Sequence, residues 1–222
     1  MRVLHLYCLN TGARFCRLLL AEGKLDVLLK LEHFWEAPES FLVLNPAGTV
    51  PVMVEDDGTV LVGTWPIIEY LHDTQPELAL LPGDPAQKAE ARRLADWFAV
   101  KFEREVIAPL INEKLLRRLT GDGVPSSAVI RAALGNLSAH LEYINHLAEH
   151  RKWLAGSKLS IADLYAAAAL SVVDYLGDVH WQDWPEAKTW YSRIKSRPSF
   201  RALLTDNVTG LMPPAHYTDL DF

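Results

Sequence analysis

The chain has 222 residues, half of them hydrophobic, and carries a formal charge of −6 at pH 7. This length suits one large or two small domains with an ample core. The acidic balance gives no general electrostatic reason to expect nucleic-acid binding.

The sequence has no clear targeting segment and no cysteine pattern typical of a disulfide-rich protein. The N-terminal ten residues lack the long apolar core of a signal peptide, and the longest apolar run, near 165–173, is too short to span a bilayer. Two closely spaced cysteines, Cys8 and Cys16, do not make a disulfide framework. We therefore expect a cytoplasmic protein with no membrane segment.

The first part of the chain alternates between strand and helix patterns. Strands are predicted over Val3–Tyr7 and Val27–Leu31, with a helix over Ala13–Gly23 between them. A loop over residues 33–38 and a short helix over Glu39–Leu44 follow. Gly23 is a suitable C-terminal cap for the first helix.

The next stretch predicts a β-hairpin followed by a helix. Pro51 precedes an apolar run, Val52–Val54, as expected of a proline at the start of a strand. Asp57-Gly58 suits the turn of a hairpin, and residues 59–62 form the returning strand. Thr64 is expected to cap the helix that comes next. The order is therefore β-α-β-α-β-β-α.

Beyond residue 76 the pattern changes to helices only. We predict a first domain over residues 1–76, a linker over 77–85, a helical domain over 86–204 and a tail over 205–222. The helical patterns cover residues 84–119, 126–149, 160–176, 184–196 and 199–204. The tail shows no helical period.

A helix start is marked near residue 160. Ser160 and Asp163 have the S-x-x-D spacing of a capping box, with Ile161 and Leu164 as apolar neighbours. Losing such a cap costs roughly 0.5–2 kcal/mol. We interpret Asp163 as a structural residue and not as a catalytic one.

The segment NPAGTVPVM, which contains Val50-Pro51, resembles the glutathione S-transferase family, and the resemblance extends over nearly the whole chain. It implies a thioredoxin-like α/β N-terminal domain and an all-α C-terminal domain. It also implies that the Val50-Pro51 bond is cis and that the following helix N-terminus binds the γ-glutamyl end of glutathione.

Catalysis in this family needs a hydroxyl or a thiol after the first strand. Tyr7 stands where Tyr-type enzymes carry their donor, and its alternative interpretation is a half-buried strand tyrosine. Thr11 lies where a Ser-type hydroxyl falls, although threonine is not the usual residue. The nucleophile of the cysteine-type loop aligns with Ala13, so that thiol is missing, and Cys16 is expected to pack as a small hydrophobe.

The glutathione pocket signature is altered at two of its marks, and Trp65 adds bulk next to Gly63-Thr64. The family has Glu-Ser or Gln-Ser where this chain has Gly63-Thr64, so the acid that pairs the ligand's ammonium group is absent. One charge-assisted hydrogen bond contributes roughly 1.5–3 kcal/mol, and its loss weakens binding by on the order of tenfold to a hundredfold. We expect no resident cofactor, and we regard glutathione as a doubtful ligand.

His146 and His150 are separated by one helical turn. No H-E-x-x-H pattern accompanies them, so a solvated helix face is the preferred interpretation and no metal site is expected.

Several segments are similar to one branch of the family, the FtsZ-binding cell-division proteins of alphaproteobacteria. They are HFWEAPESF, NEKLLRRL and above all the ending PPAHYTDLDF. The resemblance implies a non-catalytic, homodimeric adaptor that binds FtsZ filaments at the division site. Its candidate partner-binding residues are Trp35, the helix face around Glu113, Asp221 and Phe222, chosen because exposure is expected there.

Two other functions stay open from the sequence. One is a glutathione-dependent transferase that uses the hydroxyl of Tyr7 or Thr11 to activate the glutathione thiol. The other is a protein of the same fold that binds a different small ligand between its domains. The altered pocket and the unusual tail favour the adaptor.

Overall fold

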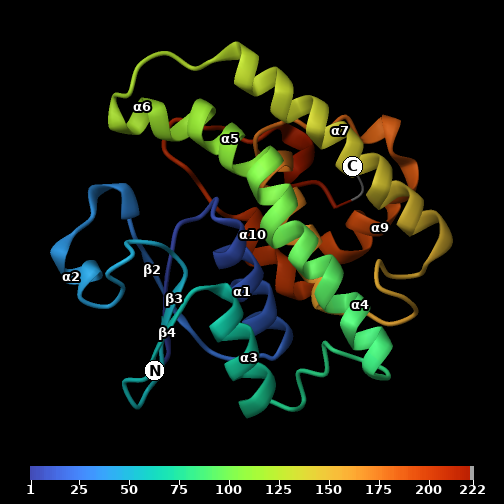
Figure 1. Cartoon of the computed structure of the whole chain (residues 1–222), viewed down its shortest axis with the longest axis horizontal. Helices are drawn as coiled ribbons and strands as arrows, with labels where there is room; N and C mark the ends of the chain where they lie inside the picture. The colour runs from blue at the N-terminus through green and yellow to red at the C-terminus, as the bar shows by residue number, and fades with distance from the viewer. Residues whose placement is uncertain (221–222) are drawn as a thin grey trace. The chain divides into compact units, whose positions relative to one another are not determined.

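The computed structural model describes residues 1–220 and divides into two compact units. The thioredoxin-like unit contains Met1–Ala79 together with Pro198–Asp206. The helical unit contains Leu80–Arg197 and the described residues from Asn207 onward (Figure 1). No helix among the described residues is long and apolar enough to cross a membrane.

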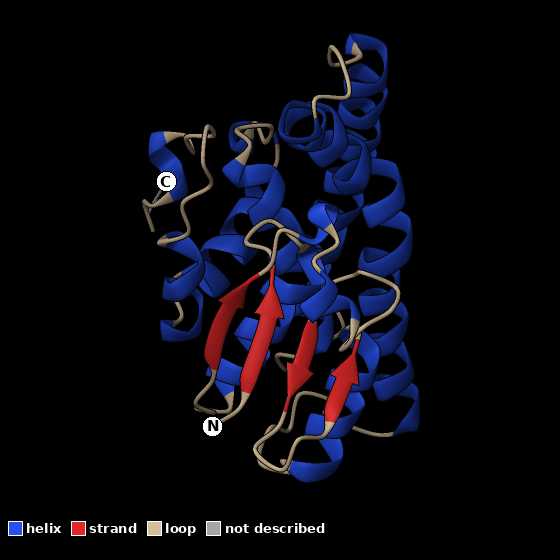
Figure 2. Cartoon of the chain, turned by 90° about the vertical axis from the view of Figure 1, so that its left-hand side faces the viewer, coloured by secondary structure: helices blue, strands red, loops and turns tan. Residues whose placement is uncertain are grey.

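The thioredoxin-like unit is built on a four-stranded sheet with the strand order β2-β1-β3-β4 (Figure 2). Strand β1 pairs in parallel with β2 and antiparallel with β3, and β3 pairs antiparallel with β4. The strands are β1 (Val3–Leu6), β2 (Leu28–Leu31), β3 (Val52–Val54) and β4 (Val60–Val62). The predicted fold class of this half is confirmed.

Helices α1 (Thr11–Glu22) and α3 (Thr64–Thr74) pack together in this unit, and α2 (Glu39–Leu42) is a single turn. Helix α1 starts two residues before its predicted start because the side chain of Asn10 accepts a hydrogen bond from the Ala13 N–H at 2.8 Å. Helix α3 buries its predicted apolar face, which consists of Ile67, Ile68 and Leu71.

A late segment of the chain also belongs to the thioredoxin-like unit, although the sequence placed most of it in the helical domain. It comprises the short helices η5 (Pro198–Phe200) and α10 (Arg201–Leu204) and ends at Asp206. The Asp206 carboxylate lies 2.9 Å from Arg14 Nη2 and 2.8 Å from Arg17 Nη1. Both arginines come from α1 and are buried, so the shared carboxylate fixes this segment to that helix.

The helical unit follows the predicted order of helices, and its long first helix contains two wider, π-helical stretches. Helix α8 is buried along its whole length. The elements are α4 (Pro85–Asp96), η2 (Trp97–Ile107), α5 (Ala108–Ile111), η3 (Asn112–Leu116), α6 (Arg117–Thr120), α7 (Ser127–His150), α8 (Ile161–Tyr175), η4 (Trp181–Asp183), α9 (Pro185–Lys195) and η6 (Ala215–Tyr217). The π-helical stretch η2 ends just before Pro109, which lacks the N–H needed for a regular helical ladder.

The start of α8 carries the capping pair that the sequence indicated. Asp163 Oδ2 accepts hydrogen bonds from the Ser160 N–H and the Ser160 hydroxyl, both at 3.0 Å. Its Oδ1 accepts from the Leu154 N–H at 2.8 Å and from Trp190 Nε1 at 3.0 Å. With four donors on one buried carboxylate, Asp163 joins the start of α8 to the preceding loop and to α9.

Candidate functional site

The starts of α1 and α3 and the loop before β3 meet in the thioredoxin-like unit, where the family resemblance implied a glutathione site. A Cβ atom added to Gly12 would lie 2.2 Å from Thr64 Oγ1 and 3.3 Å from Pro51 Cδ. Only glycine at position 12 therefore lets these three segments meet. The Val50-Pro51 bond is cis, as the family resemblance implied.

Gly63, and not Thr64, occupies the cap position of α3, so the predicted capping role of Thr64 is wrong. Gly63 has φ 88° and ψ 163°, and Thr64 is already the first helical residue. The Gly63 N–H donates to the Pro51 carbonyl at 3.0 Å, which ties the helix start to the cis-proline loop. Backbone N–H groups at a helix start suit an anionic ligand, but Pro66 in the first turn of α3 has none to donate. The pair Gly63-Thr64 supplies no carboxylate.

Both predicted hydroxyl donors lie in buried surroundings. Tyr7 is 6% exposed, and its ring meets those of Trp35 and Phe34 edge-on, with centroids 5.0 and 6.0 Å away. Thr11 is also buried, in the first turn of α1. Tyr7 follows the last residue of β1 and is packed among neighbouring rings, which supports a packing role for it.

Neither cysteine has the surroundings of a nucleophile. Cys16 is fully buried, and burial strongly raises the pKa of its thiol. Burial also raises the pKa of the Cys8 thiol, with a further increase from the Asp206 carboxylate. Reactive cysteines need the opposite shift, because the thiolate is the reacting species.

Trp35 lies in the short helix η1 (Phe34–Glu36) and is partly buried by its neighbours. Its ring stacks on the His33 ring at 5.0 Å and meets Phe34 at 5.3 Å, in addition to Tyr7. The tryptophan is thus anchored within the thioredoxin-like unit while part of it stays accessible, so an internal packing role and a binding role are compatible.

Glu113 does not lie on an exposed face, and the expectation of exposure is wrong. Its side chain is 3% exposed and accepts a hydrogen bond from the Ser126 N–H at 2.7 Å. It also lies 3.0 Å from Arg117 Nε. The Ser126 N–H lowers the pKa of this carboxyl, with a smaller contribution from Arg117. Glu113 therefore holds the start of α7, and its contact with a partner stays a prediction.

The tail is docked on the helical unit through a set of contacts that we call the tail clamp, formed by Asp174, Tyr175, Lys195, His216 and Tyr217. Asp174 Oδ1 accepts a hydrogen bond from His216 Nε2 at 3.0 Å. Lys195 Nζ donates to the His216 carbonyl at 2.9 Å. The rings of Tyr175 and Tyr217 meet edge-on at 5.1 Å.

The hydroxyl of Tyr175 holds an earlier part of the tail. It accepts from the Val208 N–H at 3.0 Å and lies 3.2 Å from the Leu211 carbonyl, to which it donates. The tail is thus held from Val208 to Tyr217. Asp221 and Phe222, predicted to bind a partner, lie outside the described residues.

Burial controls the ionisation of the clamp. Asp174 and Lys195 are fully buried, with Oδ2 and Nζ 3.9 Å apart. Burial raises the pKa of Asp174, an effect that the Trp181 hydrogen bond and the Lys195 charge oppose. Burial lowers the pKa of Lys195 to about 8, against the attraction of Asp174. The two charges therefore depend on each other inside the helical unit.

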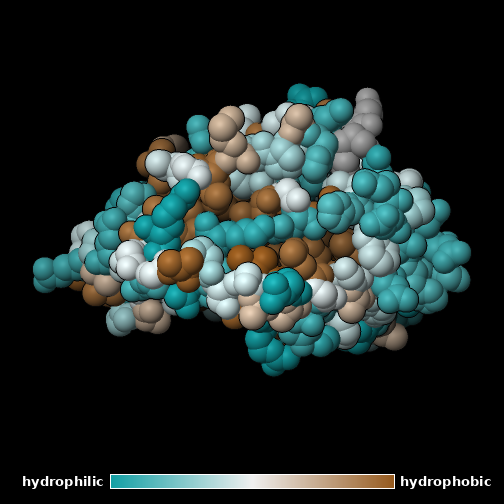
Figure 3. All heavy atoms as spheres, turned by 90° about the horizontal axis from the view of Figure 1, so that it is seen from above, coloured by the Kyte–Doolittle hydropathy of each residue, from teal (hydrophilic) through white to brown (hydrophobic). Residues whose placement is uncertain are grey.

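The sequence analysis did not predict two features of the structure. One is Asp174, whose partners Trp181 and His216 lie 7 and 42 residues further along the chain. The edge strand β2 also exposes three leucines, which are Leu28, Leu29 and Leu31. In Figure 3 hydrophobic atoms reach the surface between hydrophilic ones on the face shown.

The comparisons with known proteins agree with this geometry. Residues 13–74 match the glutathione S-transferase N-terminal domain, and residues 93–198 match the C-terminal domain. FtsZ-localized protein A of Caulobacter vibrioides is 46% identical over 100% of this chain and 98% of its own length.

Solved structures are similar over the same extent. The structure of FzlA from C. crescentus has a TM-score of 0.97 at 46% identity and covers 100% of this chain and 99% of its own. A glutathione S-transferase from Rhodospirillum rubrum F11 has a TM-score of 0.97 at 50% identity, with both chains covered completely. This chain belongs to the glutathione S-transferase family.

Proposed function

We propose that this protein is a non-catalytic adaptor that binds FtsZ filaments in the cytoplasm at the division site and supports constriction. The observation that carries the proposal is the full-length, 46% identical relative named FtsZ-localized protein A. That similarity extends over the whole chain and therefore includes the tail.

The altered pocket supports an adaptor over an enzyme. Gly63 removes the acid that would pair the ammonium group of glutathione, and Tyr7 is packed against Trp35 and Phe34. The docked tail also supports an adaptor, because the tail clamp uses a buried ion pair to hold residues 208–217 in place. Buried ion pairs are costly to desolvate, and fixing one conformation is a documented use of them.

The proposed binding surface includes the accessible part of Trp35 and the chain end at Asp221 and Phe222. Glu113 contributes by holding the start of α7. We also propose that the protein is a homodimer, which would present each of these surfaces twice to a polymer and raise its avidity.

The test is co-sedimentation of the purified protein with GTP-assembled FtsZ from the same organism, alongside calorimetric titration of glutathione. We expect the protein to pellet with polymer and to give no heat with glutathione. Absence of pelleting, together with glutathione binding in the range of roughly micromolar to millimolar, would overturn the adaptor proposal.

Matched variants locate the surface. Asp221→Lys should weaken pelleting while leaving thermal stability unchanged, and Glu77→Lys makes the same charge change at an exposed position of the linker. Equal pelleting of the two variants would exclude a role for the tail end. A large loss of stability in Asp221→Lys would instead make the end a packing element.

A glutathione transferase is the second candidate function. The observation that favours it is the meeting of Gly12, Pro51 and Thr64, which retains the backbone frame of the pocket. Turnover of a glutathione-conjugation substrate that is lost in Tyr7→Phe or in Thr11→Val would support it.

A further inference from the structure

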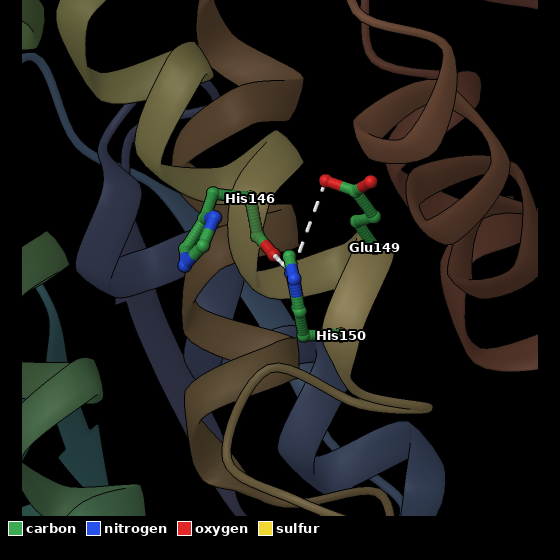
Figure 4. Close-up of side chains that lie close together, drawn as sticks. All are labelled: His146, Glu149 and His150. Atoms are coloured by element: carbon green, nitrogen blue, oxygen red, sulfur yellow. Dashed lines mark hydrogen bonds and ion pairs between the residues drawn. The ribbon is translucent and has the colours of Figure 1, made fainter.

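The last turns of α7 place three side chains with metal-binding atoms on one face. They are His146, Glu149 and His150, all exposed, and one ligand atom from each lies within 4.8 Å of the other two (Figure 4). The spacing i, i+3 and i+4 is the reason, because residues three and four apart are neighbours on a helix surface. The sequence interpretation considered the histidine pair and left out the carboxylate between them.

His150 uses one ring nitrogen for a contact with the backbone of its own helix. Its Nδ1 lies 2.8 Å from the His146 carbonyl oxygen, which can only accept a hydrogen bond. Nδ1 therefore carries the proton, and the lone pair of Nε2 is available to a metal ion. Ligating histidines in proteins commonly donate their second nitrogen to a backbone carbonyl in this way.

Local charge also favours a cation here. Glu149 Oε2 lies 3.8 Å from His150 Nδ1 and adds a negative charge beside both rings, whose centroids are 4.4 Å apart. The site stands at the C-terminal end of a 24-residue helix, where the helix dipole favours positive charge. The next basic residue, Arg151, is engaged elsewhere, since its Nη1 lies 2.9 Å from Glu90 Oε1.

We propose that His146, Glu149 and His150 bind one divalent transition-metal ion of the zinc, nickel or copper class. Two imidazole nitrogens and one carboxylate oxygen form a donor set that suits these ions, whereas magnesium and calcium prefer oxygen ligands only. Water completes the coordination shell. The chelate links residues 146 and 150 and clamps the last turn of α7.

The experiment is titration of the full chain with ZnCl₂ or NiCl₂ by calorimetry, with MgCl₂ as the negative control and native mass spectrometry for stoichiometry. We expect one ion per chain and no heat with magnesium. His146→Gln and His150→Gln should each weaken binding about tenfold or more, and Glu149→Gln should weaken it less. His72→Gln, at an exposed histidine of α3, is the matched control and should bind as the unaltered protein does.

A second readout follows the helix itself. Zinc should slow amide hydrogen exchange over residues 147–151 in the unaltered protein but not in His150→Gln. Binding should also weaken at pH 5, because protons compete for the imidazole nitrogens. Equal affinity of the His146, His150 and His72 variants would overturn the proposal. One ion shared by two chains would overturn it too, because the chelate would then not lie within one helix.

Discussion

The start of α3 lacks the charged group that the resemblance places there, whereas the tail clamp contains two buried charged groups. At the start of α3, Gly12 packs against Thr64 and the Val50-Pro51 bond is cis, but Gly63 supplies no acid. In the tail clamp a carboxylate and an ammonium group, from Asp174 and Lys195, are both fully buried.

This comparison distinguishes groups that hold the fold together from groups that only a bound ligand needs. Backbone geometry at α3 is fixed by close packing, so it persists whether or not glutathione binds. Removing one partner of a buried ion pair leaves the other charge uncompensated, which strongly destabilises the fold. The buried charges of Asp174 and Lys195 thus hold the tail of the chain, whereas the start of α3 is held by packing and a backbone hydrogen bond.

Breaking the clamp should have the largest effect. Asp174→Ala leaves Lys195, Trp181 Nε1 and His216 without their shared acceptor, and we expect a loss of about 3–5 kcal/mol in the free energy of unfolding. Urea denaturation measures it. Asp183→Ala, at an exposed position of η4, is the control and should change stability by no more than about 0.5 kcal/mol. Similar values for both variants would show that the clamp is not needed for stability.

The second prediction restores the missing acid at the start of α3. Gly63→Glu forces a side chain into a backbone conformation, φ 88° and ψ 163°, that is nearly exclusive to glycine, at a cost of about 1–3 kcal/mol. It should tighten glutathione binding by on the order of tenfold to a hundredfold, measured by calorimetry. Gly63→Ala carries the strain without the charge and should not tighten binding. Unchanged affinity in Gly63→Glu would mean that the pocket lacks more than its acid.

A surface ion pair should contribute less than the buried one. Hydrogen bonds from Arg93 and Arg151 lower the pKa of Glu90 to about 2, below its ordinary value of 4.5. Since the folded-state pKa is the lower one, this contribution is present above about pH 4.5 and is lost as the pH falls towards 2. Solvent screening limits it to about 1 kcal/mol. Glu90→Gln should therefore reduce stability at pH 7 but not at pH 2, in chemical denaturation at both values.

The smallest expected change concerns Tyr7. Tyr7→Phe keeps the ring contacts with Trp35 and Phe34 and removes only the hydroxyl, so pelleting with FtsZ should not change. Trp35→Ala, which removes the accessible ring, should reduce pelleting. Loss of pelleting in Tyr7→Phe would mean that the Tyr7 hydroxyl itself contributes to partner binding.

Much of the fold follows from local patterns. The strand runs around Val3 and Val52, the hairpin turn at Asp57-Gly58 and the apolar face of α3 predicted the sheet and its helices to within a few residues. The S-x-x-D spacing likewise indicated the start of α8, where Asp163 accepts from the Ser160 N–H at 3.0 Å. Each signal acts over a few residues, so the sequence contains it directly.

Local sequence patterns predicted the environments of the candidate site residues less well than they predicted the fold. Glu113 resembles a solvated helix residue in sequence, yet it is buried because Ser126, 13 residues later, donates its N–H to it. Thr64 resembles a cap, yet the cap position falls on Gly63 because that residue is tied to Pro51.

By itself the sequence determined the secondary structure, the two-part organisation and the absent acid at Gly63, because each depends on near neighbours or on residue type. Only the tertiary structure decided where the late segment and the tail belong. Asp206 joins Arg14 and Arg17 in the thioredoxin-like unit, and His216 joins Asp174 in the helical unit. Those pairings span 42 to 192 residues, and a charge that is buried so far from its partner in sequence is found only once the chain has folded.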